Sequence, residues 1–532
     1  MTLQHYQKTG TTVSKRLTRL LRHLLINACI GLPATPGTAA ATPPEIKFTV
    51  KHFAVDGTSP LSQQAIADYL QPLEQRQYNL KQLQEVAHGL ELAIHDQGHP
   101  FYRVSLPPQT LDGGEVKLHI VAFTLGKIDV AGNSHFTKDN IIASMPGLAV
   151  AQSPNTKNLS EHLKVTNKHP AKQLSLTFKK SQKNDQIDAK INVAEQRPFQ
   201  TSVMLNTVGT QGTGNFRLTG ALQHSNLWGL DHIINGSYAT SPDHADKVEQ
   251  YGVSYSLPLY RLKSWLSGYY AHSNINNGTV ATDLAITGSG EMAGMHYQQL
   301  LPKLGQYEHW LDLGIDNRYF LNDVQFQNIQ IGANVRSLPV SVLYKAEYPW
   351  QNTHINYHVQ WVGNTGIGDD NSQDAYRAAR LNAKQNWNLL RYGASLLVNV
   401  RQWLIQTQFN AQYSDDYLIA GEQLGIGGSY DVRGYQERET SADTGEIVKF
   451  EITTPTWQKI NLFAFYDYGH GYQNMALPGG LTDWNLSSTG VGASWQWQDH
   501  IMAKIAVANA LNNAVTTRAG DSRIHASIVL RY

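Results

Sequence analysis

The sequence predicts a mainly β protein: a transmembrane barrel of about 16 antiparallel strands, preceded by two small α+β units. Charged residues make up 16% of the 532-residue chain, against roughly 25% in soluble domains, while aromatic residues reach 10%. The mean hydropathy is -0.37, and past the N-terminus no run of about 18 apolar residues occurs. Because only helices and closed barrels satisfy the backbone inside a bilayer, any membrane-spanning part is a barrel.

The first 41 residues have the pattern of a secretory signal peptide. Basic residues are followed by an apolar stretch over 20–32 and by small residues over 38–41. We expect segment 1–41 to be removed after export. The single cysteine, Cys29, lies in it, so no disulfide or thiol chemistry is expected in the mature chain. Lipidation of Cys29 is the alternative, which Asn27 fits poorly.

Residues 46–122 and 123–197 predict two units with the same order of elements, strand–helix–helix–strand–strand. In the first we expect strands over 46–55, 101–106 and 116–121 and helices over 63–70 and 80–94. In the second we expect strands over 126–130, 175–179 and 186–193 and helices over 138–144 and 158–165. The chain therefore begins with a tandem pair of α+β units.

Short motifs in both units resemble the polypeptide-transport-associated (POTRA) domains of two-partner secretion transporters, the hemolysin and hemagglutinin secretion-activation type. They are Gly98-His99-Pro100-Phe101, Leu106-Pro107-Pro108-Gln109, Asp112-Gly113-Gly114, Gly126-Lys127-Ile128 and Gly132-Asn133. The resemblance implies periplasmic domains that catch an unfolded partner, partly by adding its extended backbone to a sheet edge. Without the resemblance, generic α+β modules stay an equal alternative.

From 199 to 532 the hydrophobic period becomes two, as in a strand with one lipid-facing side and one lumenal side. The last strand shows the pattern, with apolar residues at every second position ending on Tyr532 and with Arg523, His525 and Arg531 between them. A soluble β-sandwich would turn those charges toward a second sheet. We expect a membrane barrel, with Tyr532 as its C-terminal membrane signal.

A long loop, 414–446, follows the eleventh predicted strand, 402–413. With the N-terminal units on the periplasmic side, an odd-numbered strand ends outside, so this loop starts from the extracellular rim. It contains Val432-Arg433-Gly434-Tyr435, in which the glycine can turn the arginine in a direction closed to an ordinary loop residue. Two strands on, Phe465-Tyr466-Asp467-Tyr468-Gly469 carries an acid whose position in the alternation points it into the lumen. Arginine and carboxylate have complementary charge and geometry.

These two motifs resemble those of the transporter superfamily, which has a V-R-G-Y loop folded into the barrel and an F-x-D-x-G strand. The resemblance implies that Arg433 pairs with Asp467 and that Gly434 and Tyr435 shape the loop tip. Glu451, in the twelfth strand, is a possible second inward acid. For Arg433 taken alone, a solvated surface arginine is the simpler interpretation.

The resemblance implies an outer-membrane translocator with periplasmic POTRA domains. We expect it to export an unfolded secreted partner and to be neither an enzyme nor dependent on a cofactor or metal. The expected partner is a large exoprotein of the adhesin or cytolysin type with an N-terminal secretion domain. The resemblance does not decide whether the transporter also activates this partner. Outer-membrane lipid and the barrel-assembly machinery are the other expected partners, and a net charge of +1 gives no argument for nucleic acid.

Two other functions compete with this one. A barrel-assembly insertase shares the loop and strand motifs but usually has about five periplasmic modules, whereas this chain has room for two. A passive porin explains the alternation but not the N-terminal pair or the arginine loop. We find no G-x-S-x-G and no H-E-x-x-H motif. Between the predicted cleavage near Ala41 and the first strand too few residues remain for the barrel-plugging helix of some relatives.

Overall fold

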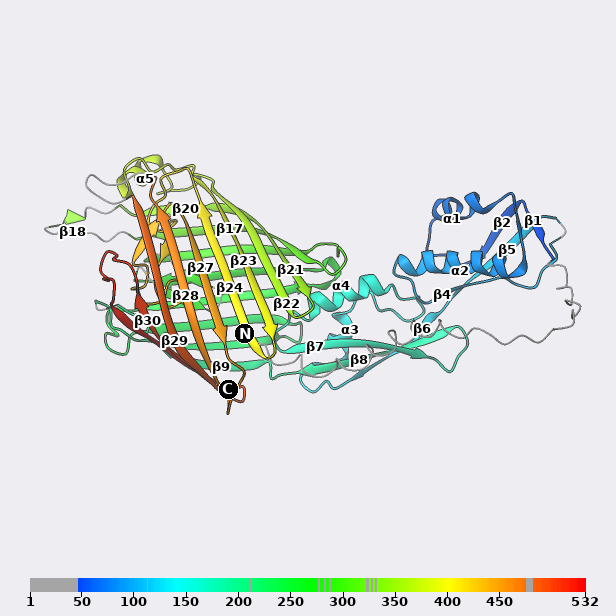
Figure 1. Cartoon of the computed structure of the whole chain (residues 1–532), viewed down its shortest axis with the longest axis horizontal. Coiled ribbons are helices and arrows are strands. Elements are labelled where there is room, and N and C mark those ends of the chain that lie inside the picture. Colours follow the sequence, from blue (N-terminus) through cyan, green and yellow to red (C-terminus); the bar gives the residue numbers. More distant parts are fainter. Residues whose placement is uncertain are drawn as a thin grey trace, which may run out of the picture.

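A computed structural model describes residues 46–532, apart from 112, 211, 276–277, 282–283, 287–288, 322–324, 327–328, 331–332 and 475–481. It shows two small α+β units followed by a closed β-barrel (Figure 1). The predicted signal segment with Cys29, and Asp112 of the first motif, lie outside the described residues. Among the helices that the structure describes, none combines the length and the apolar character of a membrane span.

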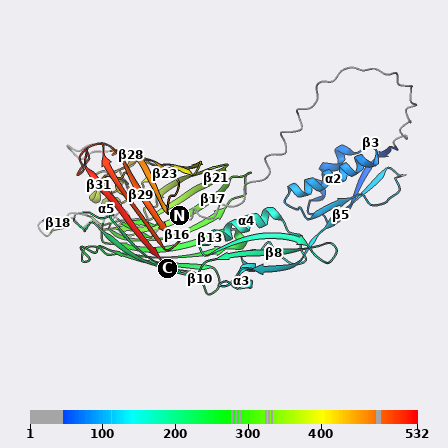
Figure 2. The same ribbon diagram turned by 60° about the horizontal axis from the view of Figure 1, so that its bottom comes forward.

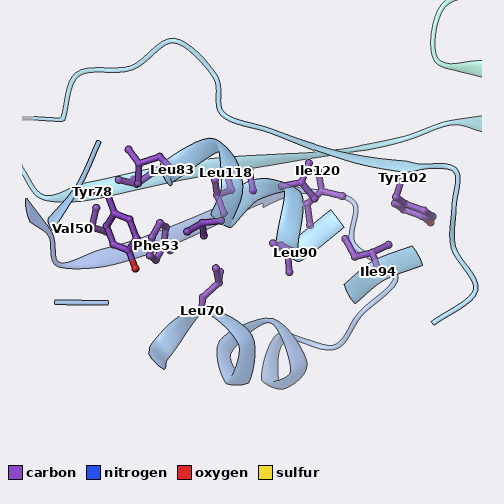
Figure 3. Packing of buried hydrophobic residues seen from close by; sticks show 14 residues of the cluster. Val50, Phe53, Leu70, Tyr78, Leu83, Leu90, Ile94, Tyr102, Leu118 and Ile120 are labelled. Atoms are coloured by element: carbon purple, nitrogen blue, oxygen red, sulfur yellow. The ribbon is translucent and has the colours of Figure 1, made fainter. Parts of the chain in front are cut away.

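The first unit packs two helices on a three-stranded sheet. Its elements are β1 (Phe48–Val50), β2 (His52–Gly57), α1 (Gln63–Leu70), η1 (Gln71–Leu73), β3 (Arg76–Tyr78), α2 (Leu80–Asp96), β4 (Tyr102–Ser105) and β5 (Glu115–Ala122). The sheet order is β2-β5-β4, with β2 parallel to β5. Helix α2 starts where Asn79 and Gln82 form a capping box. Its apolar residues recur every three or four positions, so Leu83, Leu90 and Ile94 face the sheet (Figure 3).

The strand predicted over 46–55 is divided at Lys51. The backbone N–H groups of Lys51 and His52 both donate to the carbonyl oxygen of Gly114, at 2.7 and 3.3 Å. Before this point β1 pairs with β3, and after it β2 pairs with β5. The strand-like segment is continuous in the sequence, but its two halves belong to different sheets because the carbonyl oxygen of Gly114 binds the backbone between them.

The second unit repeats this order. Its elements are β6 (Thr124–Ala131), α3 (Lys138–Ala143), α4 (Thr156–Thr166), β7 (Lys172–Lys180) and β8 (Gln186–Glu195). The sheet order is β6-β8-β7, so β7 is an edge strand. Thr137 and Asn155 cap the two helices through their side-chain oxygens. The two units meet where Phe101 lies against Phe178, with ring centroids 4.7 Å apart.

The barrel closes by pairing its last strand with its first. In chain order its strands are β9 (Phe199–Asn206), β10 (Arg217–Leu227), β11 (His232–Thr240), β12 (Gln250–Leu259), β13 (Ser264–Ser273), β16 (Gly290–Leu300), β17 (Glu308–Phe320), β20 (Val335–Ser337) with β21 (Pro339–Trp350), β22 (Thr353–Asn364), β23 (Asn388–Val400), β24 (Trp403–Tyr413), β27 (Thr444–Thr453), β28 (Ile460–Tyr472), β29 (Asp483–Trp497), β30 (Ile501–Ala510) and β31 (Ser522–Arg531). Both β20 and β21 pair with β17 and form one interrupted strand, so the closed barrel has 16 antiparallel strands. The predicted fold class is confirmed.

The remaining elements lie in the connections. They are η2 (Tyr260–Leu262), the hairpins β14 (Gly278–Ala281) with β15 (Leu284–Ile286) and β18 (Gln325–Phe326) with β19 (Ile329–Gln330), helix α5 (Gln373–Ala379), and the hairpin β25 (Leu424–Ile426) with β26 (Thr440–Ala442). The last hairpin lies inside the predicted loop 414–446, and β27 begins before that loop was expected to end. Strand β24 is the eleventh of the barrel, as predicted, so the loop starts at the rim far from the second unit.

Alternation along the strands sorts side chains between lipid and lumen. In β31, Ile524, Ile528 and Leu530 are 40 to 58% exposed on the outer wall, whereas His525 is 8% exposed. Tyr532 lies at the barrel end near the second unit, is 80% exposed, and exchanges backbone hydrogen bonds with Thr201 of β9. The strand that closes the barrel is therefore held to its first strand down to the last residue.

The second unit is joined to the barrel through a buried ion pair. In both ribbon views it lies against the barrel end, and the first unit lies beyond it (Figures 1 and 2). The Lys172 ammonium donates to the carboxylate of Asp231, in the β10–β11 turn, at 2.5 Å, and both side chains are at most 1% exposed. Asn140 and Tyr260 donate to the same carboxylate at 2.9 and 2.6 Å. Trp265 adds a bond from its ring nitrogen to the Val165 carbonyl oxygen.

This junction gives a stability prediction. Lys172→Met leaves the Asp231 carboxylate buried without its cation, which costs on the order of 3 to 5 kcal/mol. We expect the second unit of this variant to be cleaved by protease faster than in the parent, in the detergent-solubilised full chain. The matched control is Lys127→Met, because the Lys127–Asp129 pair is exposed and solvent screens such pairs, so that they contribute little to stability. Equal cleavage of both variants would contradict the buried pair's role.

Candidate lumenal site

The loop between β24 and β27 folds back into the barrel and buries its tip there. Val432 and Tyr435 are fully buried and Arg433 is 5% exposed. Before the tip, Gly427 and Gly428 have φ of 109° and 110°, and the Gly428 N–H donates to the Val432 carbonyl oxygen. These left-handed residues fold the chain into a tight turn that a residue with a Cβ would strain. The turn aims the arginine at the wall.

Arg433 is held by two acids on adjacent strands. Its Nε and Nη2 donate to the two oxygens of Asp467 in β28, at 2.6 and 2.8 Å, in a bidentate arrangement. Its Nη1 donates to Glu451 of β27 at 2.7 Å. The backbone N–H of Arg433 also donates to Asp467, at 3.2 Å. The structure thus brings together Arg433, Asp467 and Glu451, the residues singled out in the sequence.

The phase of β28 puts these partners on the lumenal face. Phe463, Phe465 and Asp467 are buried inside, whereas Leu462 and Tyr466 are 57 and 45% exposed on the outer wall. The guanidinium carbon of Arg433 lies 3.4 Å from the ring centroid of Phe465, so the ring covers one face of the cation. Phe465 thus contacts the face of the guanidinium group, while the two carboxylates bind its N–H groups.

Glycines in β28 make room for the loop. A Cβ built on Gly469 would lie 2.5 Å from the side chain of Ile426 and 2.9 Å from that of Val432. Gly471 would meet Ile426 and Ala442 at 2.7 and 2.8 Å. The lumenal wall of β28 is therefore flat where the loop lies on it, and Gly469 of the motif is needed for space.

Gly434 and Tyr435 attach the tip to the far end of the chain. Gly434, with φ of 93°, donates its N–H to Nε2 of His525 at 2.9 Å. Since Nε2 accepts, Nδ1 carries the proton and donates to Ser429 Oγ at 2.8 Å. The Tyr435 hydroxyl bonds to the backbone of Ser487 and Asn512. Strands β29 to β31 thus hold the tip from a second side.

Several of these contacts were not foreseen from the sequence. Glu439 accepts from the N–H and hydroxyl groups of Thr516 and Thr517 at 2.5 to 2.9 Å. The alternation of the last strand predicts that His525 points inward, but it does not predict Gly434 as its hydrogen-bond partner. These partners lie 77 to 91 residues apart in the chain, and no local pattern records such pairs.

The base of the loop has ion pairs of its own. Arg318 Nη1 in β17 donates to Glu422 at 2.7 Å, and the Glu422 side chain is fully buried. Arg380, directly after α5, donates through both terminal nitrogens to Asp443 at 2.5 and 2.9 Å. Asp443 also accepts from the Leu418 N–H and the Gln423 amide. The base of the loop is therefore bound both to β17 and to the connection between β22 and β23.

A family model described as haemolysin secretion/activation protein ShlB/FhaC/HecB matches residues 185–495, more than half of the chain. This chain belongs to that family. A second model, POTRA domain, ShlB-type, matches residues 48–122. The prediction of a two-partner secretion transporter is confirmed. The protein is an outer-membrane transporter that secretes a partner protein through its barrel, with its N-terminal units in the periplasm, and the alternatives of an insertase or a porin are not favoured.

Individual relatives agree with the family assignment. The outer membrane transporter CdiB of Dickeya dadantii (strain 3937) is 23% identical over 415 residues, covering 74% of this chain and 71% of that protein. The heme/hemopexin transporter protein HuxB of Haemophilus influenzae (strain 86-028NP) is 19% identical over 452 residues, covering 83 and 79%. The solved structure of CdiB from Escherichia coli superposes with a TM-score of 0.74 at 17% identity, covering 94 and 93%. The fold is shared along nearly the whole chain.

Gly469 gives a prediction about the site. In Gly469→Ala the new methyl group must displace Ile426 and Val432, at a cost on the order of 1 to 3 kcal/mol. We expect the barrel to form but the tip to be loosened, seen as more frequent open-channel events in planar bilayers. Gly236→Ala is the matched control, because a Cβ there meets nothing within 4 Å. If both variants conduct like the parent, the glycine does not serve the loop.

Proposed function

We propose that the tip carrying Arg433 is a lumenal latch, which partly occludes the barrel and is displaced when the secreted partner enters. Its support is the guanidinium group bound at once by Asp467 and Glu451, on two strands of the wall. Beside it lies a lumenal cavity of about 270 Å³, lined in part by Arg433, Glu451 and Lys504. The tip therefore narrows the lumen without filling it, and one edge of the ion cluster faces open space.

The strength of the latch follows from burial. Asp467 is fully buried, so removing Arg433 takes away the cation that binds both of its oxygens, at a cost on the order of 3 kcal/mol. Glu451 is 18% exposed and also lies 3.5 Å from Lys504. Its bond to Arg433 is the one that solvent and an incoming charged group reach first. The pair with Asp467 holds the tip, and the contact with Glu451 is the outer part of the latch.

A charge exchange tests the latch. We expect Arg433→Asp and Asp467→Arg each to reduce the partner protein in the medium at least tenfold, with the barrel still inserted, and the double variant to recover part of the loss. Asp483→Asn is the control, because this β29 acid lies outside the latch and is half exposed. The latch loses its main support if the double variant secretes no more than the single ones.

We also propose that residues 46–122 and 123–197 are the two POTRA domains, following a signal peptide at 1–41, and that β7 receives the extended partner. The Asn167 side chain bonds to both the N–H and the carbonyl of Leu174, on the side of β7 away from β8. Leu176 and Phe178 share this phase, and no partner for their backbone groups occurs among the residues that the structure describes. An extended segment of an exoprotein can add a strand there.

The course of β7 favours this edge. Its start, Lys172, is bound to the barrel turn at Asp231, and near its end Phe178 lies against Phe101 of the first unit. A strand added along β7 would thus run between the junction of the two units and the barrel mouth. This supports a partner that is handed over as extended chain, such as the N-terminal secretion domain of a large adhesin or cytolysin. We propose translocation without a catalytic step.

Crosslinking tests this edge. We expect a photoreactive residue at Thr177, exposed on β7, to form adducts with the partner in exporting cells. The control position is Lys190, which pairs with Thr177 across the sheet but lies on the central strand β8. Adducts at least fivefold more abundant at Thr177 are expected, and equal yields at the two positions would argue against strand addition to β7.

A further inference from the structure

The base of the lumenal loop is fixed to a different part of the barrel from its tip. The tip contacts β27 to β31, whereas Glu422 of the base is bound by Arg318 of β17. Arg318 also donates to Asp316 of the same strand at 2.9 Å, so its guanidinium group is bound by two carboxylates. Strand β17 is the seventh of the barrel and β28 the thirteenth. The loop has two anchors, on separated strands.

Apolar packing strengthens the base anchor. Leu418 and Ile419 are at most 3% exposed and pack with Val335 of β20, Val362 of β22 and Trp387. Next to them Gly421 lies so close to the ring of Phe320 in β17 that an added Cβ would approach it to 2.3 Å. The base is therefore part of the packed barrel wall and not a free loop segment.

Left-handed residues separate the two anchored parts on both legs of the loop. On the outgoing leg they are Gly427 and Gly428, directly after β25. On the returning leg Arg438 has φ of 51°, two residues before β26 begins at Thr440. The hairpin β25–β26 lies on β28 between the two anchored parts, and residues 427–439 form the tip. A rotation at these few residues moves the tip and leaves the β25–β26 strand pairing in place, as hinges do in other proteins.

We propose that Arg318 and Glu422 are positioning residues that keep the base of the loop on β17 while the tip, residues 427–439, swings about Gly427, Gly428 and Arg438 during export. This inference rests on the proposed latch. Moving the tip breaks the Arg433 pairs and the tip contacts with β29 to β31. Moving the whole loop would also break the Arg318 and Arg380 pairs and expose Leu418 and Ile419. The tip is the part that costs less to move.

Cysteine labelling distinguishes tip motion from motion of the whole loop. Ala508 of β30 is fully buried, and a Cβ on Gly434 of the tip would lie 3.4 Å from its Cβ. Leu418 of the base is also fully buried. We would introduce Ala508→Cys and Leu418→Cys separately in a Cys29→Ser background and add a membrane-impermeant maleimide to cells with or without the exported partner. Both sites should be protected when the partner is absent.

With the partner being exported, we expect Ala508→Cys to be labelled at least fivefold faster and Leu418→Cys to stay protected. Labelling of both sites would overturn the inference and leave the latch standing, since the loop would then leave as one piece. Labelling of Leu418→Cys alone would also overturn it. If neither site reacts while the partner is secreted, the tip does not move and the proposed latch itself fails.

A second variant tests the anchor directly. Arg318→Gln, combined with Leu418→Cys, should make that cysteine reactive in exporting cells. Arg336→Gln is the matched control, because Arg336 lies on the neighbouring β20 and its side chain donates to Asn317. If Arg318 only stabilises the barrel, Leu418→Cys should be labelled equally in the Arg318→Gln and Arg336→Gln variants. If Arg318→Gln leaves Leu418→Cys protected, β17 does not anchor the base.

Discussion

The two-residue alternation of a closed barrel is the constraint on which the rest of the structure depends. It assigns each wall side chain either to lipid or to the lumen, and a charge such as Asp467 has no alternative to the inside. A fully buried carboxylate needs a cation and donors, and neighbouring strands supply only part of them. The loop between β24 and β27 supplies the rest through Arg433. The pairing in the wall therefore sets where the loop must lie.

The same logic explains the small residues beneath the loop. A loop folded into the lumen can lie close to the wall only where the wall has no side chains. Gly469 and Gly471 provide such a surface on β28. Next to it the rings of Phe463 and Phe465 lie over Gly490 and Gly492 of β29, where a Cβ would collide with them. The glycines of β28 thus make room for the loop, and the glycines of β29 make room for the two phenylalanine rings.

The sequence predicts the parts of this arrangement that have a local period. Alternation along β28 places Asp467 inward, strand parity places the loop at the outer rim, and composition excludes spanning helices. What it does not predict are contacts that depend on closure. Arg318 and Glu422 are 104 residues apart, and Lys172 and Asp231 are 59 apart, in elements whose own patterns are ordinary. The division of the first strand at Lys51 was hidden for the same reason, because Gly114 acts from across the unit.

The positions of the contacts also bear on the route of the secreted partner. The second unit is bonded to the turns after β10 and β12, through Asp231 and Lys263, and to the start of β17, through Glu308. The base of the loop lies on β17 to β23, whereas the hairpin β25–β26 lies on β28 and the tip reaches β27 to β31. The wall covered by the tip is therefore a part of the barrel to which neither the second unit nor the loop base is fixed. A passage opened by the proposed latch would lie along that wall, and export through it would require no break in the contacts that hold the periplasmic unit to the barrel.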